Sequence, residues 1–333
     1  MTLTNQTRAA SPETILEVAT GYMAAKQLFA ASRIGLFQAL DAGPLDVAGL
    51  ASEIGASRRM TRILADSMNS LGLLEREDGT YRLTADARAY LVGSSSEVDL
   101  APFLGFLNNI SQPHWTDYFD GTVDTTEPGD LDLSDERMPV FMGGVMTYNA
   151  LHATQLAQVF DFTGYRDMLD FGGLSSAFAI EAMKTAPELK TTFVFDQAMI
   201  ESVTDNIAAS GLGGRSRVIG APTATAVPEG GHDLVMVNHV IHRFDAAQNE
   251  SILRRARGAA FDGARLILLD FFLDDDDRQR ALDALHAAEY LVIDGTTVYP
   301  EAEVREWMRR AGWRPLETLA LPGSPRIIVA EAV

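Results

Sequence analysis

The sequence contains no cysteine, which excludes disulfide bonds, thiolate nucleophiles and zinc sites with cysteine ligands. It also lacks any apolar run approaching the ~20 residues that a helix needs to cross a bilayer. The first residues, MTLTNQTRAASPET, include no apolar segment of the kind found in a signal peptide. We therefore expect a cytoplasmic protein that has no membrane partner.

Basic residues are scarce. The 27 lysines and arginines stand against 46 aspartates and glutamates, which gives a net charge of −19. A surface that binds nucleic acid or an anionic membrane needs clustered basic side chains, so this balance argues against such partners. Hydrophobic residues make up 47% of the 333 positions, enough for a real core in one large or two ordinary domains.

Residues 1–100 predict a mostly helical domain. Ser11-Pro12 suits the start of a helix, and apolar residues then recur on one helical face, at Ile15, Val18, Ala19 and Tyr22. Further helices are expected to end near Ile54-Gly55 and to span 57–71. A hairpin follows over 72–84, because Asp78-Gly79 is a strong turn signal. Helix, glycine turn, helix and hairpin form a winged-helix pattern.

The winged-helix pattern has two interpretations. In a DNA-binding module, Arg58, Arg59 and Arg62 would contact phosphates from the second helix. However, residues 1–100 carry 9 basic and 12 acidic side chains, a net charge of −3, whereas a DNA reader is locally positive. An interaction domain of winged-helix shape fits this charge better.

Residues 101–165 predict an aromatic-rich helical connector, and residues 166–333 predict an α/β domain. Apolar strand candidates alternate with helical stretches, which indicates right-handed βαβ units and a parallel sheet. The strands are expected at 167–171, 191–196, 217–221, 233–240 and 265–273, and the helices near 176–185, 198–210 and 246–258. The final runs, 313–321 and 326–333, are joined only by PGSP, so the last strand must be antiparallel to its partner.

Small and acidic residues follow the first two strands of this domain. Asp170 precedes Gly172 and Gly173, and such a turn lets a ligand approach the backbone and the N-terminus of the next helix. Asp196 closes the next strand, where a carboxylate can accept hydrogen bonds from both hydroxyls of a ribose. Each signal also has a structural alternative, since small residues serve helix–strand packing and strand-end aspartates cap helices.

Over nearly its whole length the chain resembles the S-adenosylmethionine-dependent O-methyltransferases of the plant caffeic-acid and bacterial polyketide-tailoring type. The resemblance rests on LDFGG (169–173), VFD (194–196), NHVIHRFD (238–245), LLDFFLDDD (268–276) and EAEVREWMRRAGW (301–313). It implies a Rossmann-like methyltransferase domain with an antiparallel last strand, and an N-terminal domain that forms a homodimer. It also implies S-adenosylmethionine as cofactor, bound by Asp170, Gly172, Gly173 and Asp196.

The resemblance further implies the catalytic groups. His242 matches the family's general base, and Asp270 matches the acidic residue that orients it. The family's second acidic residue falls near Val298, which cannot fill that role. In the family the connector region lines the acceptor pocket, which assigns four residues to substrate binding: Phe106, His114, Trp115 and Met146. No metal is implied.

Other polar residues receive plainer interpretations. His239 lies inside a strand candidate and is expected to pack against the sheet, while His152 and His286 are expected to be ordinary helix residues. The run Asp274–Asp277 is expected to form a solvated loop, because it lacks the interleaved pattern of a metal site.

Three residues depart from the family at the cofactor site. Leu174 and Ser176 replace glycines of its Gly-Gly-Gly-x-Gly turn, and Ala221 replaces the aspartate that contacts adenine. We predict a small-molecule methyltransferase that acts on an aromatic or enolic hydroxyl in secondary metabolism. The alternatives are an enzyme of the same fold that catalyses hydroxylation, decarboxylation or a pericyclic rearrangement, and a binding or regulatory protein.

Overall fold

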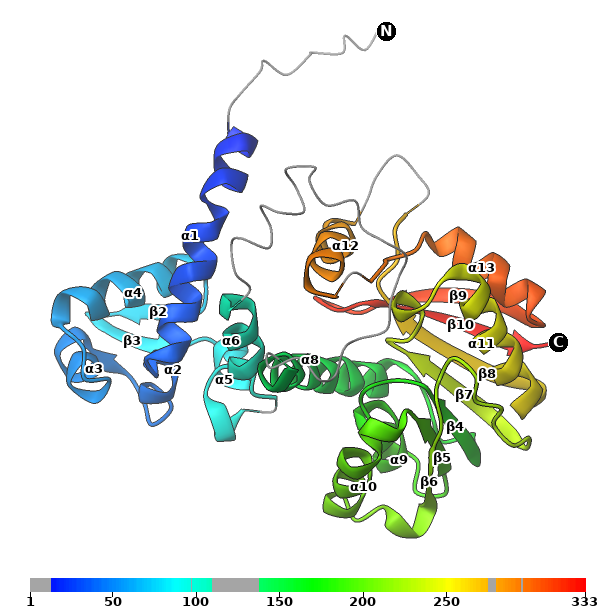
Figure 1. The fold of residues 1–333 in the computed structure, drawn as a ribbon. Coiled ribbons are helices and arrows are strands. Elements are labelled where there is room, and N and C mark those ends of the chain that lie inside the picture. The colour runs from blue at the N-terminus through cyan, green and yellow to red at the C-terminus, as the bar shows by residue number, and fades with distance from the viewer. Residues whose placement is uncertain (1–12, 97, 110–137, 275–279, 295) are drawn as a thin grey trace, which may run out of the picture. The chain divides into compact units, whose positions relative to one another are not determined.

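A computed structural model describes residues 13–333 except 97, 110–137, 275–279 and 295. The chain divides into two compact units, Met1–Asn109 and Ile110–Val333, whose elements are labelled in Figure 1. Each unit has a hydrophobic core of its own. Among the described residues, no helix is both long enough and apolar enough to cross a membrane.

The first unit is mostly helical. Its helices are α1 (Glu13–Arg33), α2 (Leu36–Ala39), α3 (Val47–Glu53), α4 (Arg58–Ser70), α5 (Ala85–Tyr90) and α6 (Ala101–Asn109), with a short 3-10 turn at Gly93–Ser95. A small antiparallel sheet has the order β1 (Leu45–Asp46), β3 (Thr80–Leu83), β2 (Leu74–Glu77). The side chains of Asp46, Ser57 and Thr84 accept hydrogen bonds from first-turn N–H groups, which fixes where α3, α4 and α5 begin.

The winged-helix pattern predicted from the sequence is present in this unit. Strands β2 and β3 pair around Asp78 and Gly79, whose φ angles of 48° and 81° are those of a tight hairpin turn. Tyr81 anchors the hairpin: its ring is fully buried, and its hydroxyl donates to Asp66 Oδ1 of α4 at 2.5 Å. The predicted helix start at Ser11-Pro12 lies outside the described residues.

A seven-stranded sheet forms the centre of the second unit. Its order is β6 (Ser216–Gly220), β5 (Lys190–Phe195), β4 (Asp167–Phe171), β7 (His232–Asn238), β8 (Ala260–Asp270), β10 (Arg326–Ala332), β9 (Trp313–Ala320). The first five of these are parallel, as expected from the alternation of strands and helices. Strand β10 runs antiparallel to both β8 and β9, which confirms the predicted antiparallel end of the sheet.

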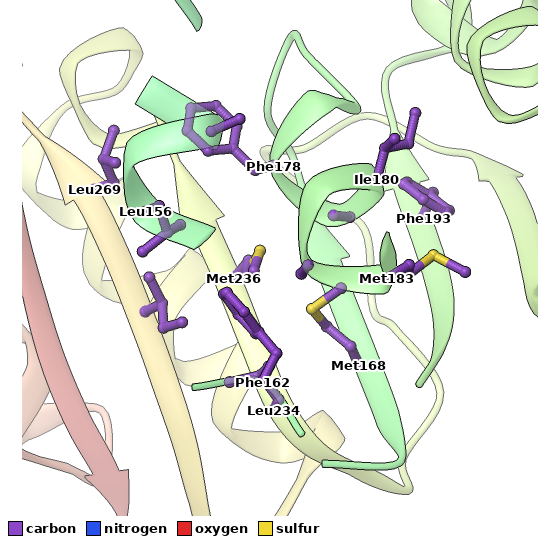
Figure 2. Close-up of a cluster of buried hydrophobic side chains, with 14 of the residues drawn as sticks. Leu156, Phe162, Met168, Phe178, Ile180, Met183, Phe193, Leu234, Met236 and Leu269 are labelled. Atoms are coloured by element: carbon purple, nitrogen blue, oxygen red, sulfur yellow. The ribbon is translucent and has the colours of Figure 1, made fainter. Parts of the chain in front are cut away.

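Helices cover both faces of this sheet. Along β7, Leu234 and Met236 belong to one core, and Val235 and Val237 belong to the other, because successive side chains of a strand point to opposite faces. The first core lies under α8 (Met138–Val159), α9 (Ala177–Thr185) and α10 (Ile200–Ala209), and Figure 2 shows part of it. The second core lies under α11 (Ala246–Ala259) and α13 (Glu301–Arg310).

The remaining elements are short or lie near the ends of the strands. Three further 3-10 turns occur at Gln197–Met199, Gly213–Arg215 and Ile241–Arg243, and helix α12 spans Ala281–Asp294. The turn at Ile241–Arg243 directly follows β7 and precedes α11. The fold therefore places this turn at the edge where the parallel strands end, which is where ligands of open α/β sheets bind.

Candidate active site at the carboxyl edge of the sheet

The carboxyl ends of β5, β4, β7 and β8 are neighbours in the sheet. The structure therefore brings six of the predicted site residues to one edge, although they are spread over a hundred positions of the sequence. These residues are Asp170, Gly172, Gly173, Asp196, His242 and Asp270.

His242 and Asp270 form a buried pair at this edge. His242 Nδ1 lies 3.0 Å from Asp270 Oδ2 and 3.1 Å from Oδ1, and both side chains are buried. Burial acts to raise the pKa of Asp270, but the interactions with His242 and the hydrogen bond from the backbone N–H of Phe271 outweigh it, so the pKa is lowered and the group stays ionised. An ionised carboxylate accepts the Nδ1–H hydrogen bond, which leaves Nε2 of His242 as the acceptor of the ring.

The backbone around His242 is held in place. Asn249 of α11 donates to the carbonyl oxygens of Ile241 at 2.8 Å and Phe244 at 2.9 Å. The carbonyl oxygen of His242 accepts from Thr297 N at 3.1 Å. The imidazole is therefore carried by a turn whose backbone is fixed on both sides, which suits a group that must be positioned against a substrate.

A pair of histidines, His239 and His152, lies beside the His242–Asp270 pair, and it was not predicted from the sequence. His239 follows the last residue of β7 with a φ of 53°, and its Nε2 lies 3.1 Å from Nδ1 of His152 in α8. Its Nδ1 lies 3.9 Å from Asp270 Oδ1. The expectation that His239 lies inside the strand is wrong, because β7 ends at Asn238 and the backbone of His239 is left-handed. His152 is a helix residue as expected, but it is fully buried and contacts His239.

Burial keeps this second pair neutral. It lowers the pKa of His239 to about 4, despite the opposing effect of Asp270, and it lowers the pKa of His152 well below the ordinary value of 6.5. One of the two nitrogens that face each other must then donate and the other accept. The signal available in the sequence was the pair of histidines at three-residue spacing, His239 and His242, at the end of a strand.

Helix α12 adds two aromatic residues to this group. The His286 ring stacks on Phe271 with centroids 3.9 Å apart, and the Tyr290 ring lies 4.6 Å from that of His242. His286 Nδ1 donates to Leu282 O at 2.8 Å, and burial lowers the pKa of this histidine. His286 is therefore a helix residue as expected, but it also belongs to the wall of the site.

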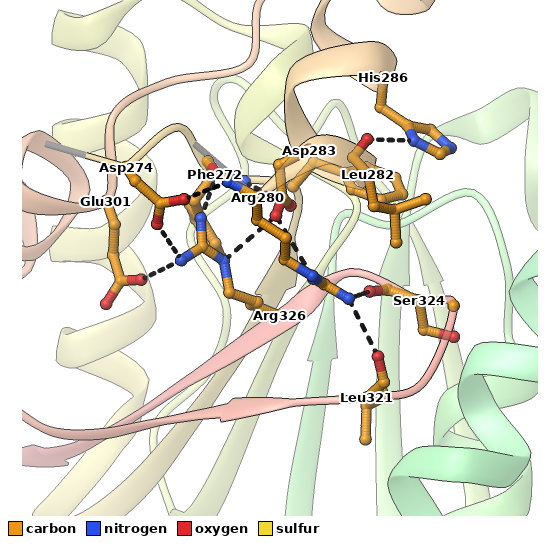
Figure 3. Close-up of polar contacts among 12 residues, drawn as sticks. Phe272, Asp274, Arg280, Leu282, Asp283, His286, Glu301, Leu321, Ser324 and Arg326 are labelled. Carbon is orange, nitrogen blue, oxygen red and sulfur yellow. Dashed lines mark hydrogen bonds and ion pairs between the residues drawn. The ribbon is translucent and has the colours of Figure 1, made fainter. Parts of the chain in front are cut away.

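A network of charged side chains ties α12 to the ends of β8 and β10 (Figure 3). Arg326 lies 2.6 Å from Asp274 Oδ1 and 3.3 Å from Glu301 Oε2, while Arg280 donates to Ser324 O at 2.9 Å. Asp283 of α12 is fully buried, and burial raises its pKa. The expectation of a solvated acidic loop is wrong for Asp274, because Arg326 neutralises it; residues 275–277 lie outside the described residues.

The residues that could hold a metal are part of the same group. His239, His242 and Asp270 each offer a ligand atom, and these atoms lie within 4.8 Å of one another. The contact with Asp270 already engages Nδ1 of His242 and both carboxylate oxygens. The contact of His239 with His152 uses Nε2, while Nδ1 of His239 lies 3.9 Å from Asp270 Oδ1.

The ends of β4 and β7 carry buried polar atoms that lack a hydrogen-bond partner among the described residues. Asp170 Oδ2 and both polar side-chain atoms of Asn238 are buried without a hydrogen-bond partner among the residues that the structure describes. Asp170 and Asn238 follow Met168 and Met236 at two-residue spacing, so they lie on the same face of neighbouring strands. Burial raises the pKa of Asp170 to about 8. Such atoms fit the polar groups of a bound molecule, since unpaired buried polar atoms are otherwise costly.

The three residues that depart from the family pattern at the cofactor site are all at least partly buried. Leu174 belongs to the first core, so its side chain is part of the hydrophobic interior. Ser176 is buried at the start of α9 and accepts from Asn206 at 3.4 Å. Ala221 is partly buried against the second core and offers no polar contact to an adenine.

Asp196 is already engaged within the chain. Its Oδ1 accepts from the backbone N–H of Thr223 at 2.9 Å, and its Oδ2 accepts from Thr223 Oγ1 at 2.8 Å and from Arg243 Nη2 at 3.1 Å. The carboxylate therefore lies at the predicted position, but with two side chains of the protein bound to it.

The predicted acceptor residues are only partly placed. Met146 lies in α8, half-buried against the first core, and Phe106 is buried in α6 of the first unit. His114 and Trp115 lie outside the described residues. A role in substrate binding stays a prediction for all four. Val298 is buried, and its apolar side chain offers no carboxylate at that position.

Comparison with known proteins agrees with this fold. Residues 127–314 match the O-methyltransferase domain family, and residues 16–93 match the O-methyltransferase dimerisation domain. The 3-hydroxy-5-methyl-1-naphthoate 3-O-methyltransferase of Streptomyces sahachiroi is 31% identical over 329 residues, which cover 95% of this chain and 94% of the relative.

Two solved structures show the same architecture. The S-adenosylmethionine-dependent methyltransferase SibL, in its apo form, superimposes with a TM-score of 0.77 at 26% identity, covering 97% of this chain and 99% of SibL. Human N-acetylserotonin methyltransferase in complex with SAM gives a TM-score of 0.77 at 22% identity, covering 98% and 99% of the two chains, a likeness of fold. The chain therefore belongs to the family of S-adenosylmethionine-dependent O-methyltransferases.

Proposed function

We propose that this protein transfers a methyl group to an aromatic or enolic hydroxyl of a natural-product intermediate, with His242 as general base. The observation that carries the proposal is the buried His242–Asp270 pair at the carboxyl edge of the sheet. The family assignment supports it, and the Streptomyces sahachiroi relative is named for methylation of a hydroxyl on a naphthoate.

S-adenosylmethionine supplies the electrophilic methyl group when it is bound. We assign Asp170, Gly172, Gly173 and Asp196 to holding it, and we add Asn238, whose buried amide has no partner among the described residues. A phenol becomes far more nucleophilic as its proton is removed, so the base decides the rate of transfer.

The residues of the chain then act on the acceptor's proton. His242 Nε2 accepts it, and the carboxylate of Asp270, 3.0 Å from Nδ1, stabilises the imidazolium that results. His239 borders Asp270 and is paired with His152, and both of these histidines are neutral, so they add no positive charge that would oppose this protonation.

Methylation assays with the purified chain test the proposed function. The chain is incubated with S-adenosylmethionine and a set of phenols and hydroxynaphthoates, and products are identified by mass spectrometry. We expect a methylated product whose formation is inhibited by S-adenosylhomocysteine, together with calorimetric binding of both cofactor forms. If millimolar cofactor neither binds nor yields a product, the proposal is wrong.

We further propose that the chain is a homodimer formed through α1. Three apolar side chains on this helix are largely exposed within one chain: Ile15 (71%), Val18 (76%) and Tyr22 (62%). A contiguous apolar stripe of this kind marks an interaction surface. Residues 16–93 match the dimerisation domain, and a second copy of the chain is therefore the partner that we assign to it.

Introducing negative charge on the apolar stripe of α1 should weaken the association of the two chains. Replacing Val18 and Tyr22 together with Glu is expected to weaken the dimer by at least about 30- to 100-fold, because unpaired carboxylates would be buried in the interface. Light scattering coupled to size-exclusion chromatography measures the mass. Val227→Glu, at an apolar position 79% exposed in the second unit, is the matched control and should leave the mass unchanged. A double variant that stays dimeric would contradict the assignment of α1.

A further inference from the structure

Arg243 is a buried arginine of the site, and it forms an ion pair with Asp196. Arg243 is 2% exposed and belongs to the same 3-10 turn as His242. Its guanidinium reaches across the strand ends, where Nη1 donates to Gly172 O after β4 at 2.9 Å and Nη2 donates to Asp196 Oδ2 after β5 at 3.1 Å. The guanidinium therefore bridges Gly172 and Asp196, two of the four residues that are predicted to bind the cofactor.

Thr223 completes this arrangement from the loop after β6. Its backbone N–H and its hydroxyl bind the two oxygens of Asp196, and the hydroxyl also lies 3.3 Å from Gly172 O. A Cβ at Gly172 would come within 2.3 Å of Thr223 Cγ2. The space between the ends of β4 and β5 is therefore occupied by side chains of the protein itself.

We propose that Arg243 is an internal competitor for Asp196, and that a nucleoside binds only when its ribose hydroxyls displace the guanidinium from this carboxylate. The inference rests on the proposed function, because it takes the ligand to be an adenosyl cofactor with a vicinal diol. A guanidinium stays charged at all working pH values, and it binds carboxylates more strongly than a neutral hydroxyl does. Arg243 therefore lowers the affinity of this site for nucleosides.

The replacement of the guanidinium by ribose hydroxyls at Asp196 requires only the side chain of Arg243 to move. The backbone of the turn is fixed by Asn249, which donates to Ile241 O and Phe244 O on either side of Arg243. His242 can consequently keep its hydrogen bond to Asp270 while the neighbouring guanidinium leaves Asp196. The position of the base and the affinity for the cofactor are set by adjacent residues that move independently.

Calorimetric titration with S-adenosylhomocysteine tests the inference. We expect Arg243→Asn to tighten binding about tenfold, because a charge-assisted hydrogen bond no longer has to be broken. Arg255→Gln is the matched control: Arg255 donates to Thr223 O and Ala224 O of the same loop, and no contact links it to Asp196 among the described residues. The control should leave the affinity unchanged.

A second titration separates competition at Asp196 from a general change of the pocket. The gain from Arg243→Asn is expected with adenosine and should be absent with dideoxyadenosine, which lacks both ribose hydroxyls. If Arg243→Asn does not fold, Arg243→Lys is used instead, since a single ammonium cannot bridge Gly172 O and Asp196 and should give a smaller gain. Equal gains with both nucleosides would overturn the inference.

The outcomes also separate this inference from the proposed function. If the unmodified chain binds S-adenosylhomocysteine and the variant binds it no more tightly, the inference is wrong and the proposed function stands. If only the variant binds, the inference is supported, and methyl transfer by the unmodified chain is rejected. If neither binds at millimolar ligand, both are wrong.

Discussion

Replacing His242 with Gln is expected to lower kcat by about 10²- to 10⁴-fold, the usual contribution of a positioned general base. Glutamine fills a similar volume but cannot take up the acceptor's proton. Because His242 is buried at the end of the sheet and its backbone is held by Asn249 and Thr297, the substitution should leave the fold and cofactor affinity unchanged. Steady-state kinetics and calorimetry measure the two quantities separately.

The decrease in kcat caused by His242→Gln should depend on the acidity of the acceptor hydroxyl. A phenol that ionises by itself needs no base, so the deficit of His242→Gln should shrink as the pH rises above the acceptor's own pKa, and should be smaller for more acidic phenols. His232→Gln is the matched control, since His232 is a buried histidine at the opposite end of β7. If His242→Gln retains the full kcat, the assignment of the base is wrong.

Asp270→Asn tests the partner of the base. The amide keeps the shape of the side chain but removes the charge that stabilises the imidazolium and selects the Nδ1–H tautomer. We expect kcat to fall together with kcat/KM, because the lost interaction is made mainly in the transition state. The measurement is the same kinetic assay, and a change in KM alone would indicate a role in binding.

Acid should destabilise the second unit through its buried neutral histidines, and this is the second large effect that we expect. The pKa of His152 lies well below 6.5 in the folded chain, and that of His239 is about 4, both mainly because of burial. Below pH 6.5 the unfolded chain takes up protons that the folded chain does not. Each such histidine therefore costs about 1.4 kcal/mol of stability per pH unit between that value and its pKa in the folded chain.

A variant isolates the contribution of His152. Asp170 has the opposite effect on stability, because its pKa is raised to about 8 in the folded chain. The stability that Asp170 contributes is therefore lost as the pH rises from its unfolded pKa toward 8. The pH profile of the unmodified chain thus contains both effects. The difference between the unmodified chain and His152→Gln removes this problem. Relative to the unmodified chain, the variant should gain about 1.4 kcal/mol for each pH unit below 6.5 over which His152 stays neutral in the folded chain.

Urea denaturation at several pH values measures this difference. Above about pH 7 both histidines are neutral in the folded and unfolded chains, so the two stability curves should run parallel there. A difference that stays constant down to about pH 5 would show that His152 takes up a proton in the folded chain, against the burial argument.

Most of the architecture was predictable because its signals are local in the sequence. The apolar run DMLDF coincides with β4, and Asp78-Gly79 forms the turn between β2 and β3. The four-residue link between the last two strands leaves no length for a crossover, so the antiparallel end of the sheet followed from the spacing alone. The convergence of His242, Asp270 and Asp196 was also predictable, because parallel strands end at one edge.

The partners of these residues were decided only by the tertiary structure. His152 and His239 are 87 positions apart and meet because α8 crosses the strand ends, while Arg243 reaches Asp196 from 47 positions away. Asp274 is not the solvated residue that we expected, because it is paired with Arg326, which lies 52 positions further along the chain. Periodicity and turn chemistry determine which segment becomes a strand or a helix and where it ends. Which side chains meet across those ends depends on sheet order, register and rotamer, which a local pattern does not contain.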